Sequence, residues 1–305
     1  MKISVIVPCL KNEELLPQAL ESVEAAAAGL DVETLVVEDT KRKGPSWARN
    51  RALDKATGDY VFFCDADDTV EKDFFRLPMQ TMEKDCSDVC MFSFRGCPRF
   101  ETGVVDGNGA VREKYLPAFF GVSFDDVRRW NRGGKLLARQ MPGMVWRCAY
   151  RRELLEKNAI RFDEKMPFWE GSAFISECMA FAKRVSAIPD RLYGYRHHQL
   201  GESLAARAGE IRRWDHNFHA HAFRLRLNER TGGEIWKYCE ASPVLSAISM
   251  SRTWHRLRLA RWQYLDELGD LLSDELAADS LARFPVSWIC HPLVALSVAC
   301  LRRRF

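Results

Sequence analysis

The sequence of 305 residues lacks the two commonest phosphate-binding signatures. No GxGxxG pattern follows the first strand-like run, and no GxxxxGK[ST] pattern occurs anywhere. A dinucleotide-binding site and a P-loop are therefore disfavoured. Charge of one sign is also scarce, because 45 Lys and Arg against 42 Asp and Glu leave a net charge of +3. So small an excess gives no reason to expect a nucleic-acid partner.

Paired cysteines and long apolar runs are missing as well. The ten cysteines are dispersed without a CxxC pair, so no zinc pattern is complete and we expect reduced thiols in the cytosol. No stretch is long and apolar enough to predict a transmembrane helix. The chain begins directly with a strand-like run at 2–7, so we expect no signal peptide and a cytoplasmic location.

Strand-like and helix-like segments alternate over the first hundred residues. Short apolar runs predict strands, and apolar residues at helical spacing predict helices between them, with Asn12 and Ser46 as candidate caps. The predicted strands are 3–7, 34–37, 60–64 and 88–94, and the predicted helices begin near 15 and 47. This order predicts an α/β fold with a mostly parallel sheet and flanking helices.

Three of these strands end in polar or acidic residues. The first leads into 8–13, the second ends in Glu38 and Asp39, and the third leads into an acidic cluster at 65–68. Alone, such a cluster is more often a solvated turn, because close carboxylates repel each other. Ligands bind beyond the carboxyl ends of parallel strands, so the three ends together predict one site with several acids, a metal and a nucleotide.

Six segments in this order resemble family 2 glycosyltransferases of the GT-A fold. The resemblance covers roughly 3–100 and rests on 3–8, 12–13, 36–39, 48–50, 56–60 and 65–68. A weaker resemblance to bacterial members of the family extends it to about residue 203. It rests on 145–146, 150–155, 160–162, Glu170, Phe174 and 193–196.

The resemblance implies that several of these residues bind a nucleoside diphosphate sugar. Pro8 and Glu13 would border the nucleotide. Asp39 would accept a hydrogen bond from the base, typically uracil, and Arg49 would line the same pocket. Asp65 would lie near the ribose. The implied donor is therefore a UDP-linked sugar.

The resemblance also implies a metal and an inverting reaction. Asp67 or Asp68 would bind Mn²⁺ or Mg²⁺ that bridges the diphosphate, so Asp67 belongs to the nucleotide-sugar site too. The metal would neutralise charge on the leaving nucleoside diphosphate. A base would deprotonate an acceptor hydroxyl for in-line attack on the anomeric carbon.

The sequence departs from the family pattern at the residue expected to be that base. With Phe174 as the register mark, Gly171 stands where many relatives have the catalytic aspartate. Either the preceding Glu170 has taken this role, or another carboxylate serves, or the protein is catalytically impaired. Glu170 also begins a segment, 170–181, that we predict to be a helix.

The C-terminal third gives no site of comparable strength. His198 could be a further metal ligand, but a surface histidine pair is the commoner case, and His216, His219 and His221 are better explained as structural or solvated. Residues 206–283 are arginine-rich and helical in pattern, and an apolar tail at 284–301 precedes three arginines. The tail suits either an interfacial helix on an anionic membrane or packing on the domain or in a homodimer.

We therefore predict a nucleotide-sugar-binding GT-A core at 1–135, an acceptor-side part of the same domain at 136–205 and a helical region at 206–305. The predicted activity is transfer of a hexosyl-type sugar from a nucleoside diphosphate donor, UDP-linked, to a glycan or lipid-linked acceptor. The setting would be cell-surface polysaccharide assembly, with peripheral contact to the cytoplasmic face of the membrane.

The alternative is a degenerate transferase that binds nucleotide or glycan without turnover. A nucleotidyltransferase is a third reading, but it would need a glycine-rich loop at 8–11, which the chain lacks.

Overall fold

The computed structural model describes residues 1–10, 14–96, 99–120, 143–166, 169–196 and 222–239. By internal contacts the chain divides into two units. The first comprises Met1–Tyr115, Pro142–Glu164 and Trp169–Leu200, and the second comprises Leu116–Met141, Lys165–Phe168 and Gly201–Phe305. No helix of the described residues is both long and apolar enough to cross a membrane.

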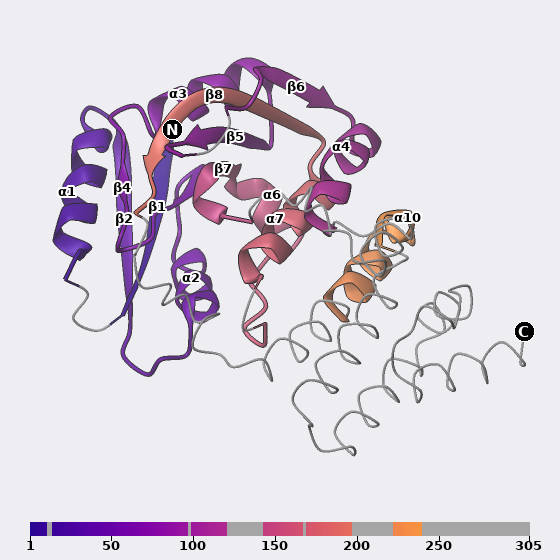
Figure 1. Ribbon diagram of the computed structural model, residues 1–305, viewed down its shortest axis with the longest axis horizontal. Coiled ribbons are helices and arrows are strands. Elements are labelled where there is room, and N and C mark those ends of the chain that lie inside the picture. The colour runs from indigo at the N-terminus through magenta and orange to yellow at the C-terminus, as the bar shows by residue number, and fades with distance from the viewer. Residues whose placement is uncertain (11–13, 97–98, 121–142, 167–168, 197–221, 240–305) are drawn as a thin grey trace, which may run out of the picture. The chain divides into compact units, whose positions relative to one another are not determined.

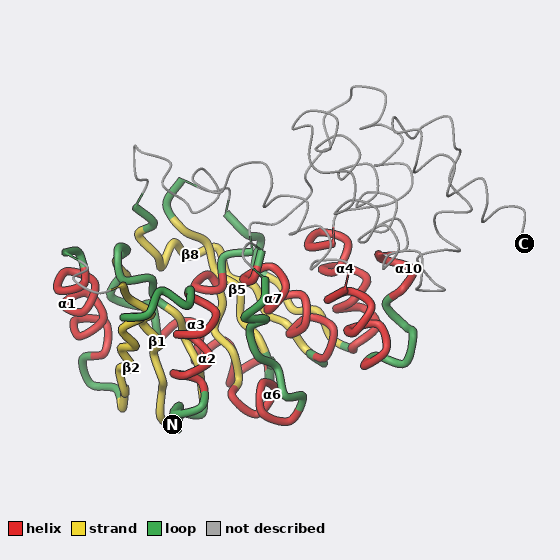
Figure 2. The backbone as a smooth tube through the Cα atoms, turned by 90° about the horizontal axis from the view of Figure 1, so that it is seen from below, coloured by secondary structure: helices red, strands yellow, loops and turns green. Residues whose placement is uncertain are grey.

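The first unit is built on an eight-stranded sheet with helices along it (Figures 1 and 2). The strand order is β2-β1-β3-β7-β5-β8-β4, and β6 also pairs with β8. The strands are β1 (Lys2–Leu10), β2 (Asp31–Asp39), β3 (Tyr60–Phe63), β4 (Thr69–Val70), β5 (Val89–Phe94), β6 (Gly103–Asp106), β7 (Cys148–Arg151) and β8 (Arg184–Gly194). The helices of this unit are α1 (Leu16–Ala27), α2 (Pro45–Leu53), α3 (Arg76–Asp85), α6 (Arg152–Lys157), α7 (Glu170–Phe181) and the short 3-10 helix η1 (Val145–Arg147), with α4 (Asn108–Phe120) running across its boundary.

The predicted α/β fold with a mostly parallel sheet is confirmed. β1 pairs in parallel with β2 and with β3, and β5 pairs in parallel with β8. β7 was not predicted; it lies antiparallel between β3 and β5. The predicted cap Ser46 is wrong, because α2 begins at Pro45 after Gly44, whose φ of 102° suits glycine.

The core explains why β3 is apolar at every position. Phe62 packs against the rings of Phe74 and Phe75, with ring centroids 5.3 and 5.1 Å away. Its neighbour Phe63 points to the other face of the sheet, where it meets another group of rings. That group consists of Tyr150, Phe162 and Phe174. A strand covered on both faces needs an apolar side chain at each position, which the run 60–63 provides.

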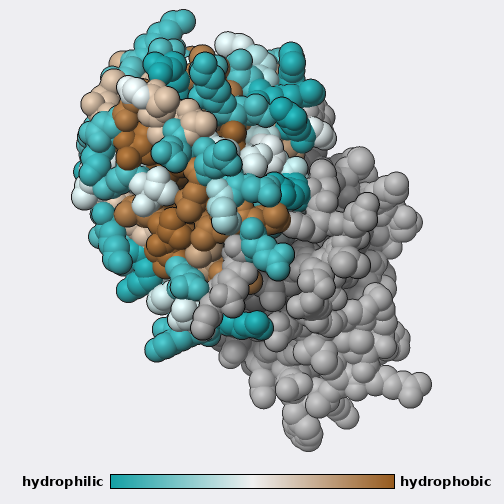
Figure 3. Space-filling model, turned by 90° about the vertical axis from the view of Figure 1, so that its left-hand side faces the viewer, coloured by the Kyte–Doolittle hydropathy of each residue, from teal (hydrophilic) through white to brown (hydrophobic). Residues whose placement is uncertain are grey.

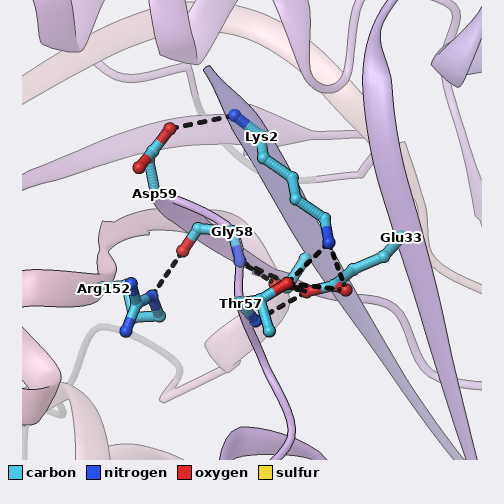
Figure 4. Close-up of polar contacts among 7 residues, drawn as sticks. Lys2, Glu33, Thr57, Gly58, Asp59 and Arg152 are labelled. Atoms are coloured by element: carbon cyan, nitrogen blue, oxygen red, sulfur yellow. Dashed lines mark hydrogen bonds and ion pairs between the residues drawn. The ribbon is translucent and has the colours of Figure 1, made fainter.

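At the amino edge of the sheet, a polar network joins the starts of β1, β2 and β3 (Figure 4). Glu33 forms an ion pair with Lys2 at 2.8 Å and accepts hydrogen bonds from Thr57 and from the Gly58 N–H. A Cβ on Gly58 would lie 2.5 Å from the Ser4 nitrogen. The segment 56–60, one of the family signatures, therefore holds the strands together at the edge opposite the acidic residues.

β2 lies at one end of the strand order, and apolar side chains remain exposed beside it. Val36 on β2 is 42% exposed and Leu10 at the end of β1 is 54% exposed. Figure 3 shows apolar residues gathered on this side of the molecule. Edge strands with exposed apolar residues are places where other chains can add. The predicted homodimer stays a prediction.

The described part of the second unit is helical. It includes α10 (Trp236–Cys239), preceded by a turn at Gly232 and Gly233, both with positive φ. Leu227 and Ile235 are buried there. Most of the predicted helical region at 206–305, including the apolar tail and the histidines at 198, 216, 219 and 221, lies outside the described residues.

Candidate active site

The parallel strands β2, β1 and β3 end at the same edge of the sheet. Leu10, the last residue of β1, pairs with Asp39, the last residue of β2. Ile6 pairs with Phe63 at the end of β3, directly before the acidic cluster. Pro8 lies half-buried on β1 between these points, whereas Glu13 falls outside the described residues. The candidate site is built on this edge.

Arg49 on α2 is the centre of the site. Its guanidinium donates from Nη2 to Asp65 Oδ1 at 2.8 Å and from Nη1 to Glu170 Oε1 at 3.2 Å. Only 7% of its side chain is exposed. Burial alone would lower the pKa of Arg49, but the charges of Asp65 and Glu170 raise it above its usual value. The arginine thus joins a residue predicted to lie near the ribose to the residue predicted as the base.

One donor of this buried guanidinium has no partner among the described residues. Arg49 Nε–H is buried and makes no hydrogen bond there. A buried donor left unsatisfied costs free energy, typically about 1–3 kcal/mol. A phosphate, ribose or base oxygen placed against Nε would satisfy it. The residues at this edge therefore fit an oxygen-rich ligand such as a nucleotide.

Asp39 holds the loop that leads into α2. Its Oδ1 accepts the Lys43 N–H at 2.9 Å and its Oδ2 accepts the Gly44 N–H at 2.7 Å. The residue is 3% exposed. Each carboxylate oxygen has two acceptor sites, so the predicted hydrogen bond with a base remains compatible with these contacts. The structure gives Asp39 a loop-shaping role that the sequence did not predict.

The acidic cluster forms a turn that is held by Tyr193 of β8 and by Arg196, two residues after the end of that strand. The Asp65 N–H donates to the Tyr193 hydroxyl at 3.0 Å, and this hydroxyl donates to Asp68 Oδ2 at 2.9 Å. Asp68 Oδ1 accepts the Arg196 N–H at 2.7 Å. The Tyr193 ring is fully buried and stacks on Trp146 with centroids 3.9 Å apart. The contact between Tyr193 and the turn was missed by sequence reasoning, although 193–196 belongs to the resembling segments.

The three acids of the turn have different surroundings. Asp68 is 2% exposed, and burial raises its pKa to about 7, although the Arg196 N–H opposes this shift. Asp65 and Asp67 are only half-buried. Of the two predicted metal ligands, Asp67 therefore has the more accessible carboxylate. Asp68 has both oxygens engaged inside the protein.

The donor set at this edge fits a metal that is only partly held by protein. Among the described residues, no group of three or more His, Cys, Asp or Glu side chains could hold a metal ion. Mg²⁺ commonly binds through one or two carboxylates and takes its other oxygens from phosphates and water. Asp65 and Asp67 can supply this share, with a nucleoside diphosphate supplying the rest.

Glu170 is the first residue of α7, and the backbone before it is unusual. Trp169, the residue that caps the helix, has φ of +67°, a conformation that bulky residues rarely adopt. The predicted helix 170–181 is confirmed. Glu170 has 21% of its side chain exposed and faces Arg49. The neighbour of the Glu170 carboxylate on this side is thus the Arg49 cation.

The glycine that replaces the expected aspartate is closely packed. A Cβ on Gly171 would lie 2.1 Å from the carbonyl oxygen of Gly143, which is well inside any permissible contact. Gly171 is buried, whereas Glu170 before it is half-buried. A carboxylate at 171 would require the segment around Gly143 to move. This contact explains why glycine stands at this position of the chain.

Asn50, next to Arg49, fixes the chain that precedes α7. Its Nδ2 donates to the Phe162 carbonyl and its Oδ1 accepts the Phe162 N–H, both at 2.9 Å. Phe162 stacks on Phe174 of α7 with centroids 4.1 Å apart, and the Arg49 guanidinium lies 5.3 Å from its ring. Arg49 and Asn50 thus hold Glu170 and Phe162 in place, respectively.

Comparison with known proteins agrees with this architecture. The model of the glycosyl transferase family 2 matches residues 36–157. Poly(ribitol-phosphate) beta-N-acetylglucosaminyltransferase TarS of Staphylococcus aureus is 25% identical over 232 residues, which are 68% of this chain and 37% of TarS. The uncharacterized glycosyltransferase YibD of Escherichia coli is 30% identical over 202 residues, which are 65% of this chain and 56% of YibD. The chain thus spans between about a third and three fifths of the length of these relatives.

Solved structures show the same fold. The crystal structure of S. aureus TarS 1-349 in complex with UDP-GlcNAc superposes with a TM-score of 0.59 at 20% identity, and the match covers 98% of this chain and 88% of that one. The chain thus has the GT-A fold, as the sequence predicted. The match to the glycosyl transferase family 2 model lies within residues 36–157.

Proposed function

We propose that this protein transfers a sugar from a nucleoside diphosphate donor, UDP-linked, to a glycan or lipid-linked acceptor in cell-surface polysaccharide assembly. The observation that carries the proposal is the bridge from Asp65 through Arg49 to Glu170. It brings a nucleotide-binding candidate and a base candidate to one sheet edge. TarS is named for a sugar transfer to a phosphate polymer and has been solved with UDP-GlcNAc, which favours this class of reaction.

The donor would lie across the ends of β1, β2 and β3. Asp39 would accept a hydrogen bond from the base, Pro8 and Glu13 would border the nucleotide, and Arg49 Nε would donate to one of its oxygens. Asp67, helped by Asp65, would hold Mn²⁺ or Mg²⁺. When bound, the cation supplies positive charge against the leaving diphosphate. Asp68 keeps the acidic turn in shape through its bonds to Tyr193 and to the Arg196 N–H.

Glu170 would act as the base that accepts the proton of the acceptor hydroxyl. Its Oε1 is bound by Arg49, while Oε2 makes no hydrogen bond that involves the described residues. A carboxylate at this position is a group able to accept a proton from a hydroxyl. Attack on the face opposite the leaving group would invert the anomeric configuration. The reaction would take place in the cytoplasm, at or near the membrane surface.

A protein that binds the nucleotide sugar without turnover is the second candidate. The close packing of Gly171 against Gly143 favours it, because the position of the usual catalytic carboxylate cannot accept a side chain without a shift. In that case Glu170 would serve only as the partner of Arg49. The two candidates share a nucleotide site and differ in whether a sugar is released from UDP.

A panel of nucleotide sugars separates the candidates. Thermal shift with Mn²⁺ present identifies the donor that stabilises the fold, and release of UDP from it measures turnover. For an enzyme, Asp67→Ala abolishes turnover, and Glu170→Gln lowers it by about a hundredfold or more. Glu153→Gln, an exposed glutamate on α6, is the matched control. Turnover that survives Glu170→Gln would exclude this residue as the base, and tight UDP binding without turnover on any acceptor would favour the binding protein.

A further inference from the structure

Three consecutive cations occupy the loop between β2 and α2. Lys41, Arg42 and Lys43 are all exposed. The loop follows Asp39 at the carboxyl edge of the sheet, and Figure 1 shows it protruding past this edge between β2 and α2. We call residues 41–43 the basic loop. Its charges stand beside the candidate active site.

The basic loop is held in one shape by the protein. The two carboxylate oxygens of Asp39 bind the N–H groups of Lys43 and Gly44, and the Asp39 carbonyl accepts the Arg42 N–H at 3.4 Å. The Lys43 ammonium lies 5.1 Å from the ring centre of Trp47 on α2. The cations therefore project from a fixed turn, which lowers the entropic cost of binding a ligand.

Within the described residues, no carboxylate forms an ion pair with the basic loop. Many surface cations elsewhere form ion pairs, such as Lys2 with Glu33, Arg95 with Glu71 and Arg184 with Asp106. In the described part of the chain, no carboxylate lies within 4.0 Å of the charged atoms of Lys41, Arg42 or Lys43. Exposed Glu38 precedes the loop without forming an ion pair with it. The loop thus presents uncompensated positive charge.

We propose that the basic loop binds the acceptor, and that the acceptor is a phosphate-bearing glycan chain; this rests on the function proposed above. Three cations on successive residues of a turn spread outward, which suits anionic groups repeated along a chain better than a single anion. Lysine and arginine both form charge-assisted hydrogen bonds with phosphate. Arg49 lies four residues beyond Pro45, about 6 Å along the axis of α2. An acceptor held by the loop therefore lies close to the site of reaction.

A membrane surface is the less suitable partner for this loop. Proteins that lie on membranes combine basic residues with apolar side chains that enter the lipid. The basic loop is flanked by Thr40 and Gly44, neither of which is a large apolar residue. Within the loop itself, only electrostatic attraction would act on a membrane, and it would act on any anionic surface. A soluble phosphate polymer distinguishes the two partners.

The experiment measures binding of fluorescently labelled inorganic polyphosphate to the full chain. In the test variant, Lys41→Gln, Arg42→Gln and Lys43→Gln are combined. The control variant combines Lys55→Gln, Lys72→Gln and Lys84→Gln, three exposed lysines elsewhere that remove the same charge. We expect about a tenfold loss of affinity in the test variant and a weaker salt dependence, as for three exposed charge contacts. The control variant should stay within about twofold of the unmodified chain.

Three results would overturn the proposal. Equal losses in both variants would mean that only net charge matters. Unchanged polyphosphate binding in the test variant would mean that the basic loop is not the site. Binding to phosphatidylglycerol vesicles that depends on the loop, while polyphosphate binding does not, would assign it to the membrane. UDP binding by the unmodified chain is measured in parallel, because its absence would count against the proposed function and not against the basic loop.

Discussion

Arg49 Nη1 lies 3.2 Å from Glu170 Oε1, although the two residues are 121 positions apart in the chain. The same guanidinium reaches Asp65 Oδ1 at 2.8 Å. A planar guanidinium can bind two carboxylates at once, and a lysine ammonium cannot reproduce this geometry. The bridge therefore depends on arginine and not only on positive charge.

Arg49→Lys tests this dependence. We expect UDP affinity to fall about tenfold, because a lysine keeps the charge but loses the fork that aligns Asp65 and Glu170. The free energy of unfolding should fall by about 1–3 kcal/mol as buried partners lose hydrogen bonds. Titration calorimetry and urea unfolding measure the two effects. Arg51→Lys on the same helix, half exposed and in surface ion pairs, is the control and should change neither. An Arg49→Lys protein with unchanged UDP affinity would remove Arg49 from the nucleotide site.

The Tyr193 hydroxyl supports a second prediction, since it joins Asp65 to Asp68 across the acidic turn. Tyr193→Phe keeps the stack on Trp146 but leaves the buried Asp68 Oδ2 without this donor. We expect the Mn²⁺ concentration needed for half-maximal UDP binding to rise about tenfold, because the turn loses its fixed shape. Intrinsic tryptophan fluorescence can follow the titration.

Tyr150→Phe is the matched control for this change. Tyr150 is equally buried, and its hydroxyl donates to the Val145 carbonyl at 3.0 Å, with no contact to the acidic turn. Tyr150→Phe should lose about 1–3 kcal/mol through one unsatisfied group, and Tyr193→Phe should lose more, because the Asp65 N–H and Asp68 Oδ2 both lose their partner. Only Tyr193→Phe should change the metal dependence. An equal change in both variants would reduce Tyr193 to a general core residue.

The sequence predicted much of this fold because each strand carries its own local pattern. The β3 run is apolar throughout, the β1 run 3–7 is apolar except for Ser4, the two strands lie in parallel, and α7 occupies 170–181 as expected. β7 could not be predicted in this way, because Cys148–Arg151 is four residues long and ends in arginine. Its position is decided by pairing with β3 and β5, which are distant in sequence.

In the candidate site, too, the features with a local sequence pattern were predicted and the contacts between distant residues were not. Its acids were predicted because they follow strands directly in the sequence, and ligands bind beyond the carboxyl ends of parallel strands. Sequence reasoning did not find that Asp68 is buried while Asp67 remains accessible, since this depends on Tyr193 and the Arg196 N–H. It also did not predict that Arg49 lies beside Glu170. Contacts between residues more than a hundred positions apart leave no local pattern in the sequence.

Gly171→Ala tests the packing that accompanies the missing aspartate. The added Cβ would meet the Gly143 carbonyl oxygen at 2.1 Å, so we expect a loss of about 1–3 kcal/mol in unfolding free energy. Gly109→Ala is the control, because that glycine lies in α4 with no atom within 4 Å of its Cβ position. Alanine favours helix there and should stabilise by up to about 1 kcal/mol. Equal stability of both variants in urea would contradict the packing argument.

Gly171→Asp extends the test to catalysis. This change introduces the carboxylate that the family resemblance implies at this position, but its side chain would start against the Gly143 carbonyl. We expect a less stable protein and no gain in sugar transfer, because a buried carboxylate without a partner is costly. Turnover is measured as UDP release from the donor found in the thermal-shift panel. A variant with clearly faster transfer would show that position 171 still points to the acceptor and that Glu170 is a poor substitute.

The lowered pKa of Glu33 predicts how the free energy of unfolding depends on pH. Burial would raise its pKa, but hydrogen bonds from Lys2, Ser4 and Thr57 lower it from 4.5 to about 2. The unfolded chain therefore takes up this proton first as the pH falls. The stability contributed by Glu33 is fully present above its ordinary pKa of 4.5 and is lost as the pH falls towards about 2. Urea unfolding from neutral to about pH 3 should show this decline.

Glu33→Gln should flatten that part of the curve. The amide cannot titrate, so the variant should be less stable than the unmodified chain at neutral pH. The free energies of unfolding of the two proteins should converge near about pH 3 or below. Glu21→Gln, an exposed glutamate on α1, should leave the curve unchanged. The network joins the starts of β1, β2 and β3 at the edge away from the acidic turn, so UDP binding at neutral pH should be the same in both variants. Parallel curves for Glu33→Gln and the unmodified chain would show that the network contributes nothing through the charge of Glu33.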